Sequence, residues 1–302
     1  MISDVSVLIP AYGESPFLLD TLNSVSRNSV QPSEILVIDD GLSKKIVQDI
    51  EIFSSTFQVK VIKSEGKGLV EALNTGLKKA RYKFICRIDN DDLMLENRIE
   101  RQLHHFETNK KIVAVGSQCI YIDSSNKETG ISRYPNGDIS ENSEFPFQCL
   151  IAHPSSMYLR EAALKINGYR SLFKWNNIDI AEDFDFWLRL SKLGEIQIFN
   201  EYLTKYRQHA NQLSTLNSFA QRIGTPYISA VNKANLENPR KLEFISKDLS
   251  EKKFLIQIIK KYLGYKKASS IYLLFFHLEN PQFFKVKFLS EIFNKLVNFF
   301  YI

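Results

Sequence analysis

Short apolar runs alternate with longer amphipathic segments through the first part of the chain. The runs are rich in β-branched residues, which is typical of strands buried in a parallel sheet. They occupy residues 5–9, 35–38, 59–62, 83–88 and 112–115. Because strands and helices alternate at this spacing, the pattern predicts an α/β fold with a parallel, doubly wound sheet.

The intervening segments have the apolar periodicity of helices. In the first of them Leu18, Leu22 and Val25 share one face. Ser15 and Pro16 are expected to begin this helix as its cap and its first helical residue. Two later segments carry the same kind of stripe, formed by Leu69, Leu73, Leu77 and Ala80 and by Ile99, Leu103 and Phe106.

Polar clusters follow three of the predicted strands. They read PAYGE after the first strand, DDG after the second and DNDD after the fourth. Ligands of doubly wound sheets bind beyond the carboxyl ends of the strands, so we expect these three loops to converge on one edge. The chain has no GxGxxG after the first strand and no GxxxxGK[ST], so dinucleotide and P-loop sites lose their main support.

The stretch RIDNDD at 87–92 places three carboxylates and an amide at the end of an apolar run. Asp89 and Asp91 can share a Mg²⁺ or Mn²⁺ ion, because these hard cations prefer oxygen ligands. A solvated turn with Asn90 in a left-handed conformation is an equal alternative for an isolated motif. Adjacent carboxylates repel one another, however, and a cation would relieve that repulsion. Asp92 is expected to begin the next helix.

A second acidic group opens the segment AEDFDFWLRL at 181–190, which we predict to be a helix. Glu182 and Asp183 would lie in its first turn, where carboxylates stabilise a helix by interacting with its dipole. The alternative interpretation is catalytic. A carboxylate fixed at a helix start beside a sugar hydroxyl could accept its proton as a general base.

A third cluster, YRQHANQLS at 206–214, contains Arg207 and His209. In an extended loop this spacing points both side chains to the same side. Arg207 could then meet phosphate and His209 could ligate a metal. An isolated Arg/His pair is more often a solvated surface pair without a function. Three polar clusters in one chain, however, make a functional role of each more probable.

The C-terminal segment makes the protein basic. The 302-residue chain has a net charge of +5, and in residues 246–302 ten Lys stand against four Asp or Glu. Lysines interleaved with aromatic residues suit a helix lying on an anionic membrane surface. A helical subdomain that packs on the main body with solvated lysines is the alternative. Nucleic acid is disfavoured as a partner, because no recognised binding motif accompanies the charge.

The apolar runs predict no membrane-spanning helix. IYLLFF at 271–276 falls short of the roughly 20 residues that cross a bilayer. Asp4 and the lack of a basic flank before the first apolar run favour a core strand over a signal peptide. A cytoplasmic protein is therefore expected. Cys86, Cys119 and Cys149 are widely spaced and form no CxxC, so free thiols are expected.

Taken in order, the motifs resemble those of the family 2 glycosyltransferases, in the bacterial surface-polysaccharide branch that makes O-antigens and capsules. The similar segments are VSVLIPAYGE, ILVIDDGLS, GLVEALNTGLKKA, RIDNDD, HPSSMYLR, NGYR, AEDFDFWLRL and YRQHANQLS. The likeness covers about residues 3–215. Gly13-Glu14 stands where the family usually has Asn, and Leu42 is inserted before the Ser of the second segment.

This resemblance implies a GT-A fold with two halves, which an extension follows. The first is a Rossmann-like nucleotide-sugar-binding half at 1–116, built on the doubly wound, mainly parallel sheet. The second is an acceptor-binding half at 117–220. A basic, aromatic-rich helical extension at 221–302 lies outside the resemblance.

The resemblance also implies roles for individual residues. Asp183 would be the catalytic base, Asp91 the main metal ligand, and Asp89 and His209 further metal ligands. His153, Pro154, Met157 and Tyr169 would belong to the acceptor side, although a buried structural role for His153 is equally expected. The residues expected to bind the nucleotide sugar are Pro10, Ala11, Tyr12, Glu14, Asp39, Asp40, Lys67, Asp89, Asn90 and Arg207.

The implied reaction is inverting transfer of a hexose or N-acetylhexosamine from a UDP-sugar to a saccharide acceptor, with Mn²⁺ or Mg²⁺ bound. The acceptor is expected to be linked to undecaprenyl diphosphate, with the enzyme peripheral on the inner face of the cell membrane. A nucleotidyltransferase is one alternative, but it usually has a basic phosphate loop after the first strand, and PAYGE has no basic residue. A non-catalytic sugar-nucleotide-binding protein is the other.

Overall fold

The computed structural model describes residues 3–54, 58–209, 218–233 and 242–244. Two compact units make up the chain. The first unit comprises Met1–Phe145, Cys149–Arg170 and Arg189–Gln212, and the second comprises Pro146–Gln148, Ser171–Leu188 and Leu213–Ile302. Because the units interleave along the sequence, the division predicted at residue 220 stays a prediction.

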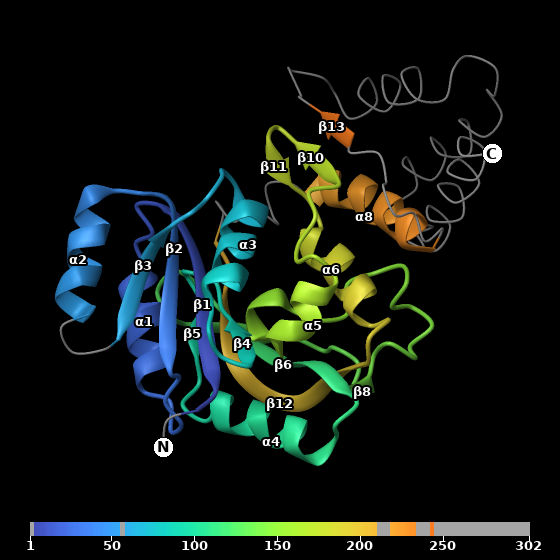
Figure 1. The fold of residues 1–302 in the computed structure, drawn as a ribbon, viewed down its shortest axis with the longest axis horizontal. Helices are drawn as coiled ribbons and strands as arrows, with labels where there is room; N and C mark the ends of the chain where they lie inside the picture. Colours follow the sequence, from blue (N-terminus) through green and yellow to red (C-terminus); the bar gives the residue numbers. More distant parts are fainter. Residues whose placement is uncertain (1–2, 55–57, 210–217, 234–241, 245–302) are drawn as a thin grey trace. The chain divides into compact units, whose positions relative to one another are not determined.

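The first unit is built on a ten-stranded sheet (Figure 1). Its strand order is β3-β2-β1-β4-β9-β6-β12-β5, with β7 paired to β6 and β8 paired to β12. The bounds are β1 (Val5–Gly13), β2 (Glu34–Leu42), β3 (Val59–Lys63), β4 (Phe84–Arg87), β5 (Leu93–Met94), β6 (Ile112–Ile122), β7 (Glu128–Ile131), β8 (Gly137–Asp138), β9 (Met157–Leu159) and β12 (Glu195–Arg207).

Most of the long strands run in one direction. β1 is parallel to β2 and β4, β2 is parallel to β3, and β6 is parallel to β12. The short strand β9 lies between β4 and β6 and is antiparallel to both, so these two neighbours share one direction. The predicted mainly parallel sheet is thereby confirmed.

Helices cover both faces of the parallel part of the sheet. Val5, Val7 and Ile9 of β1 belong to one core cluster with apolar residues of α1, α2 and α4. Leu8 points to the other face, where a Cβ atom added at Gly76 of α3 would lie 2.0 Å from its Cδ1 atom. The predicted double winding is confirmed. The helix bounds are α1 (Leu18–Ser26), α2 (Lys44–Ser54), α3 (Leu69–Lys79), α4 (Arg98–Thr108) and α5 (Arg160–Lys165).

The predicted start of the first helix is wrong. α1 begins at Leu18, and the residue before it, Phe17, makes no side-chain cap hydrogen bond. Ser15 has a φ of 37°, and its hydroxyl donates to the main-chain oxygen of Tyr12 at 2.9 Å. The hydroxyl is thus used to close the loop after β1 instead of capping the helix. The predicted apolar face is correct, since Leu18, Leu22 and Val25 are fully buried.

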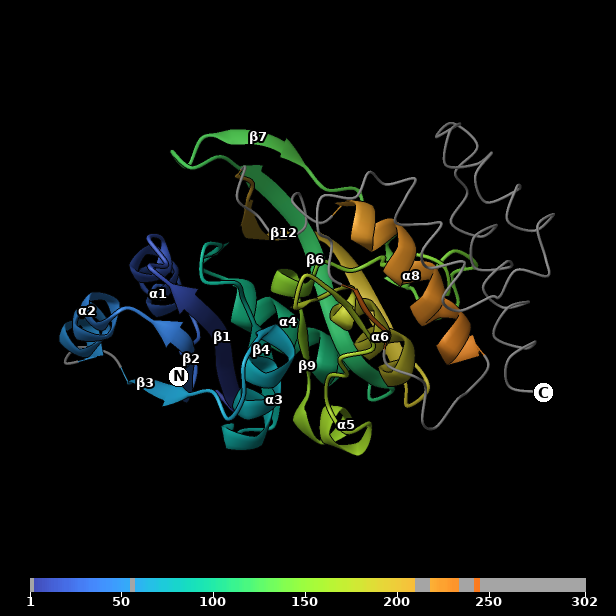
Figure 2. The same cartoon turned by 90° about the horizontal axis from the view of Figure 1, so that it is seen from above.

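The second unit has a small sheet of its own, with strand order β11-β10-β13. These strands are β10 (Phe173–Trp175), β11 (Ile178–Asp179) and β13 (Leu242–Phe244), and Figure 2 shows helices α6 (Glu182–Leu190) and α8 (Ser218–Lys233). The helix predicted at 181–190 is confirmed as α6, whose residues up to Leu188 belong to this unit.

Helix α8 contacts other parts of the second unit. Asn232 of α8 donates to the carboxylate of Asp185 in α6 at 2.9 Å. A Cβ atom at Gly224 would lie 3.0 Å from Ile180, so α8 approaches its neighbours closely at that turn. Most of the predicted C-terminal extension, residues 245–302, lies outside the described part of the chain.

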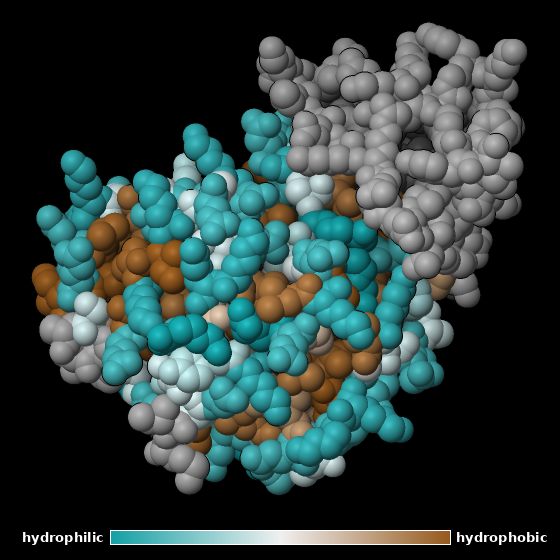
Figure 3. Space-filling model, viewed as in Figure 1, coloured by the Kyte–Doolittle hydropathy of each residue, from teal (hydrophilic) through white to brown (hydrophobic). Residues whose placement is uncertain are grey.

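Apolar side chains of the described residues are mostly buried. On the face drawn in Figure 3, hydrophilic residues surround smaller apolar areas. Among the described helices, none combines the length and the apolar character needed to traverse a bilayer. The three cysteines, all within the described residues, form no disulfide, as predicted, and Cys86 and Cys119 are buried while Cys149 is partly exposed.

Candidate active site

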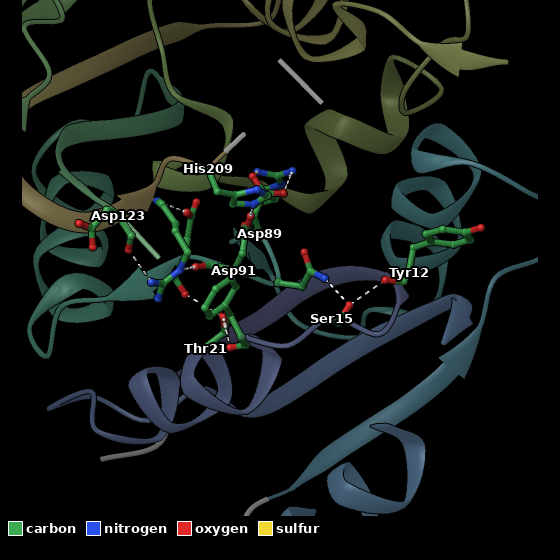
Figure 4. A network of polar contacts seen from close by, with 12 residues as sticks. Tyr12, Ser15, Thr21, Asp89, Asp91, Asp123 and His209 are labelled. Atoms are coloured by element: carbon green, nitrogen blue, oxygen red, sulfur yellow. Dashed lines mark hydrogen bonds and ion pairs between the residues drawn. The ribbon is translucent and has the colours of Figure 1, made fainter. Parts of the chain in front are cut away.

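The loops that follow β1, β2 and β4 meet at the carboxyl edge of the sheet. The amide of Ser43, after β2, donates to the carbonyl of Gly13 at the end of β1 at 3.1 Å. The side-chain amide of Asn90, after β4, donates to the hydroxyl of Ser15 at 2.5 Å. Ser15 in turn donates to Tyr12, so one chain of hydrogen bonds joins the first loop to the acidic stretch (Figure 4). The predicted convergence is confirmed.

Asp39 shapes the last residues of β2. Its Oδ1 atom accepts hydrogen bonds from the amides of Gly41 and Leu42, at 2.8 and 2.6 Å. Gly41 has a φ of 121°, which side chains rarely allow. A Cβ atom there would also lie 3.3 Å from the ring of Tyr12. The glycine therefore lets the Tyr12 ring, which is 72% exposed, lie over this turn.

Asp40 ties the end of β2 to the start of α3. Its Oδ2 atom accepts from the amide of Gly68 at 2.9 Å. Burial is the largest cause that raises the pKa of Asp40, and the charge of Asp39 adds to it. The hydrogen bond from Gly68 and the nearby charge of Lys67 act in the opposite direction. The Lys67 side chain is exposed, so a positively charged group lies just before α3.

The predicted residues of the first loop differ in exposure. Pro10 and Ala11 are buried within β1, whereas Glu14 is exposed and accepts a hydrogen bond from the Ser43 hydroxyl at 3.2 Å. Gly13 has a φ of 69°, in the left-handed region that glycine adopts readily. The Gly13-Glu14 departure from the family pattern is thus accommodated by a tight turn. Nucleotide contacts of these residues stay predictions.

Asp89 forms a bidentate ion pair with Arg87. The Nη1 and Nη2 atoms of Arg87 donate to the two carboxylate oxygens at 2.8 and 2.5 Å. The Arg87 side chain is only 2% exposed, whereas that of Asp89 is 30% exposed. A buried guanidinium therefore fixes the orientation of a carboxylate that still faces solvent. Arg87 had no role in our sequence interpretation.

Asp91 contacts His209. The Nε2 atom of His209 lies 3.0 Å from Oδ2 of Asp91, and the imidazole ring lies near the ring of Phe17, with centroids 6.4 Å apart. Burial is the main cause that raises the pKa of Asp91, and the charge of Asp89 raises it further. The predicted proximity of His209 to Asp91 is therefore present in the structure, while metal binding by either residue stays a prediction.

Asp92 does not begin a helix, contrary to expectation. It is followed by the short strand β5, and the next helix, α4, begins at Arg98. Asp92 is 1% exposed, and its Oδ1 atom accepts from the amide of Arg207 at 2.7 Å. Burial is the main cause that raises its pKa well above the usual value, followed by the charges of Asp89 and Asp91.

The acidic stretch has the composition of a divalent cation site. Carboxylate oxygens of Asp89, Asp91 and Asp92 lie within 4.8 Å of one another. The Oδ2 atom of Asp92 is buried and has no hydrogen-bond partner among the described residues. Clustered carboxylate oxygens are the donor set that Mg²⁺ and Mn²⁺ prefer. These residues therefore fit such an ion.

Arg207 is the last residue of β12 and not part of an extended loop. Its guanidinium is buried, and Nε and Nη1 donate to the main-chain oxygens of Asp91 and Asp123 at 2.7 and 2.9 Å. The guanidinium also lies over the ring of Phe17 at 4.1 Å. Arg207 thus fixes the main chain of the acidic stretch. Its predicted contact with the diphosphate has no support in these contacts and stays a prediction.

Asp183 lies in the first turn of α6, in the second unit. Its carboxylate accepts a hydrogen bond from the amide of Phe184 at 2.8 Å. Ala181, just before the helix, has a φ of 54°, which is unusual for a residue with a side chain. The residue that leads into α6 thus has a strained backbone, as often occurs at functional positions. The role of Asp183 as a base stays a prediction.

His153 has the buried position that was one of its two expected roles. Its Nε2 atom lies 2.9 Å from the hydroxyl of Tyr169, which lies 3.1 Å from the hydroxyl of Tyr158. Burial, assisted by the charge of Arg87, holds the pKa of His153 well below its usual value. A neutral imidazole is therefore expected in this buried polar cluster.

The mainly parallel sheet, the three converging loops and the acidic cluster are the features expected of a GT-A fold. The chain belongs to glycosyl transferase family 2, whose family model matches residues 6–166. The resemblance seen in the sequence is thereby confirmed.

Bacterial glycosyltransferases are similar in sequence to this chain and support the same class. An uncharacterized glycosyltransferase of Haemophilus influenzae is 30% identical over 227 residues, which cover 72% of this chain and 69% of that protein. The O-antigen biosynthesis glycosyltransferase WbnJ of Escherichia coli is 28% identical over 213 residues, covering 68% of this chain and 80% of WbnJ.

A solved structure shares the fold. The crystal structure of S. aureus TarS 1-349 in complex with UDP-GlcNAc superposes with a TM-score of 0.62 at 15% identity. The match covers 89% of this chain and 75% of that one. At this identity the likeness shows the fold alone.

Proposed function

We propose that the protein transfers a hexose or N-acetylhexosamine from a UDP-sugar to a saccharide acceptor in surface-polysaccharide biosynthesis, with inversion at the anomeric carbon. The observation that carries the proposal is the carboxylate cluster at the sheet edge where nucleotides bind in this fold. The O-antigen relative and the UDP-GlcNAc complex of the similar TarS structure support the pathway and the donor class.

The donor would bind across the three loops. Tyr12 and Asp40 would contact the nucleoside, and Asp91, with Asp89 and His209, would hold Mn²⁺ or Mg²⁺. Asp92 adds a third carboxylate to this group, and this one is buried. Such an ion, when bound, stabilises the negative charge that develops on the leaving diphosphate.

The acceptor hydroxyl needs a group that takes its proton as it attacks. Asp183 would be this base, since a carboxylate positioned at the hydroxyl can accept its proton. Attack from the face opposite the leaving UDP gives the inverted product. One carboxylate then suffices, because no covalent sugar intermediate has to form and break.

A thermal-shift screen tests the donor and the metal together. UDP-sugars are expected to raise the melting temperature in the presence of Mn²⁺, and GDP-, CMP- and dTDP-sugars are not. Slow hydrolysis of the UDP-sugar without an acceptor is also expected, and it separates a transferase from a non-catalytic binder. Release of pyrophosphate from a nucleoside triphosphate and a sugar phosphate would instead identify a nucleotidyltransferase.

The basic C-terminal segment suggests where the acceptor is found. We propose a peripheral location on the inner face of the cell membrane, where residues 246–302 contact anionic lipid and the acceptor is linked to undecaprenyl diphosphate. The ten lysines and interleaved aromatic residues of this segment support the idea. Deleting residues after 245 is expected to move the protein from the membrane fraction to the supernatant. Unchanged sedimentation with membranes would contradict the proposal.

A further inference from the structure

Arg87 occupies an unusual place for a cation. It ends β4, which lies between β1 and β9. Its amide donates a hydrogen bond to the carbonyl of Ser156 at 3.0 Å, and Arg98 donates to its carbonyl at 2.7 Å. Its guanidinium points toward the acidic stretch and donates hydrogen bonds to both carboxylate oxygens of Asp89. A permanent positive charge thus lies directly beside the proposed cation site.

The two outer carboxylates of the Asp-x-Asp motif therefore differ in charge balance. The charge of Asp89 is matched by Arg87 at 2.5 Å, in a pair whose guanidinium is almost fully buried. The carboxylate of Asp91 is hydrogen-bonded to His209 instead. Buried charges interact strongly because water screens them little. Asp91 keeps its negative charge for a cation, whereas the Asp89–Arg87 pair is close to neutral.

We propose that Arg87 is a positioning residue that acts through Asp89 in two ways. Its two parallel hydrogen bonds fix the Asp89 carboxylate in one orientation toward the donor. Its charge weakens the binding of the divalent cation, so that the metal and UDP can leave after each transfer. This inference rests on the proposed metal-dependent function. Product release limits the rate of many enzymes, and a site with two uncompensated carboxylates would retain the product longer.

The charge effect is tested by titrating Mn²⁺ into the full-length protein without nucleotide, with free Mn²⁺ followed by electron paramagnetic resonance. Arg87→Gln removes the positive charge and is expected to tighten Mn²⁺ binding about tenfold. Arg87→Lys keeps the charge, so its Mn²⁺ affinity should stay near that of the wild type. Lysine cannot make the two parallel hydrogen bonds of a guanidinium, so the Asp89 carboxylate can rotate in this variant. The KM for the donor is therefore expected to rise more than kcat falls.

Arg101→Gln is the matched control. Arg101 forms the same kind of bidentate pair with Glu201, at 2.7 and 2.9 Å, between α4 and β12 and outside the acidic stretch. Its loss should leave Mn²⁺ affinity unchanged. A purely structural role for Arg87 predicts weaker or unchanged Mn²⁺ binding in a folded Arg87→Gln variant, and either result would overturn the proposal.

A second pair of variants keeps the proposal testable if Arg87→Gln does not fold. Asp89→Asn alone leaves Arg87 uncompensated and should weaken Mn²⁺ binding. The double variant Arg87→Gln/Asp89→Asn also removes the positive charge and should bind Mn²⁺ more tightly than Asp89→Asn, while it still lacks the Asp89 ligand. A double variant that binds as weakly as Asp89→Asn would overturn the role of Arg87. If the wild type itself binds no Mn²⁺, the metal part of the proposed function fails instead.

Discussion

The variant Asp183→Asn is expected to lose sugar transfer while it still binds UDP and Mn²⁺. A positioned general base contributes roughly 10²–10⁴-fold to the rate, so kcat should fall by about that factor. Asparagine keeps the size of the side chain and can still accept the hydrogen bond from Phe184. Transfer is measured with radiolabelled UDP-sugar and a saccharide acceptor, and binding by thermal shift with UDP.

Glu182→Gln is the control for the structural interpretation of this acidic turn. Both substitutions remove one carboxylate from the first turn of α6, so both lose a similar interaction with the helix dipole, about 0.3–1 kcal/mol. Their melting temperatures should therefore fall alike. Transfer should collapse in Asp183→Asn only. Near wild-type turnover in Asp183→Asn, or an equal loss in both variants, would show that Asp183 is not the base.

Local periodicity predicted the sheet and its edge because these features depend on neighbours in the sequence. The apolar runs became β1 to β4 and the start of β6, and the loops after β1, β2 and β4 meet as expected. The start of α1 was missed for a physical reason. Ser15 and Pro16 have the composition of a helix start, but the Ser15 hydroxyl bonds to Tyr12 and serves the loop.

The roles within RIDNDD depend on contacts that the motif does not contain. Asp92 is buried against the amide of Arg207, which is 115 residues away in the sequence. No local pattern predicts such a contact, and so Asp92 was placed at a helix start. The Arg87–Asp89 pair could have been found. Residues two apart at the end of a strand point to the same face, where opposite charges attract.

Asp91→Asn is expected to abolish Mn²⁺ binding and to lower transfer at least about a hundredfold, because the ion supplies several kcal/mol of charge stabilisation. The Mn²⁺ titration should show the loss of Mn²⁺ binding. UDP binding that depends on Mn²⁺ should be lost as well. Asp123→Asn is the control, since the Asp123 carboxylate bonds only to nearby Ser125 and Lys127 among the contacts described for it. Intact Mn²⁺ affinity in a folded Asp91→Asn variant would exclude Asp91 as the main ligand.

The pH dependence of the wild type provides a separate test of Asp91. Burial and the charge of Asp89 raise its pKa, so the carboxylate gains its proton at a higher pH than an ordinary aspartate does. A protonated carboxyl is a poor metal ligand, and Mn²⁺ affinity should therefore weaken as the pH falls, starting above the usual titration range of aspartate near pH 4. Arg87→Gln leaves the charge of Asp89 uncompensated and should move this loss to still higher pH. A profile unchanged by that substitution would mean that Asp89 and Arg87 do not act on Asp91 as a charge pair.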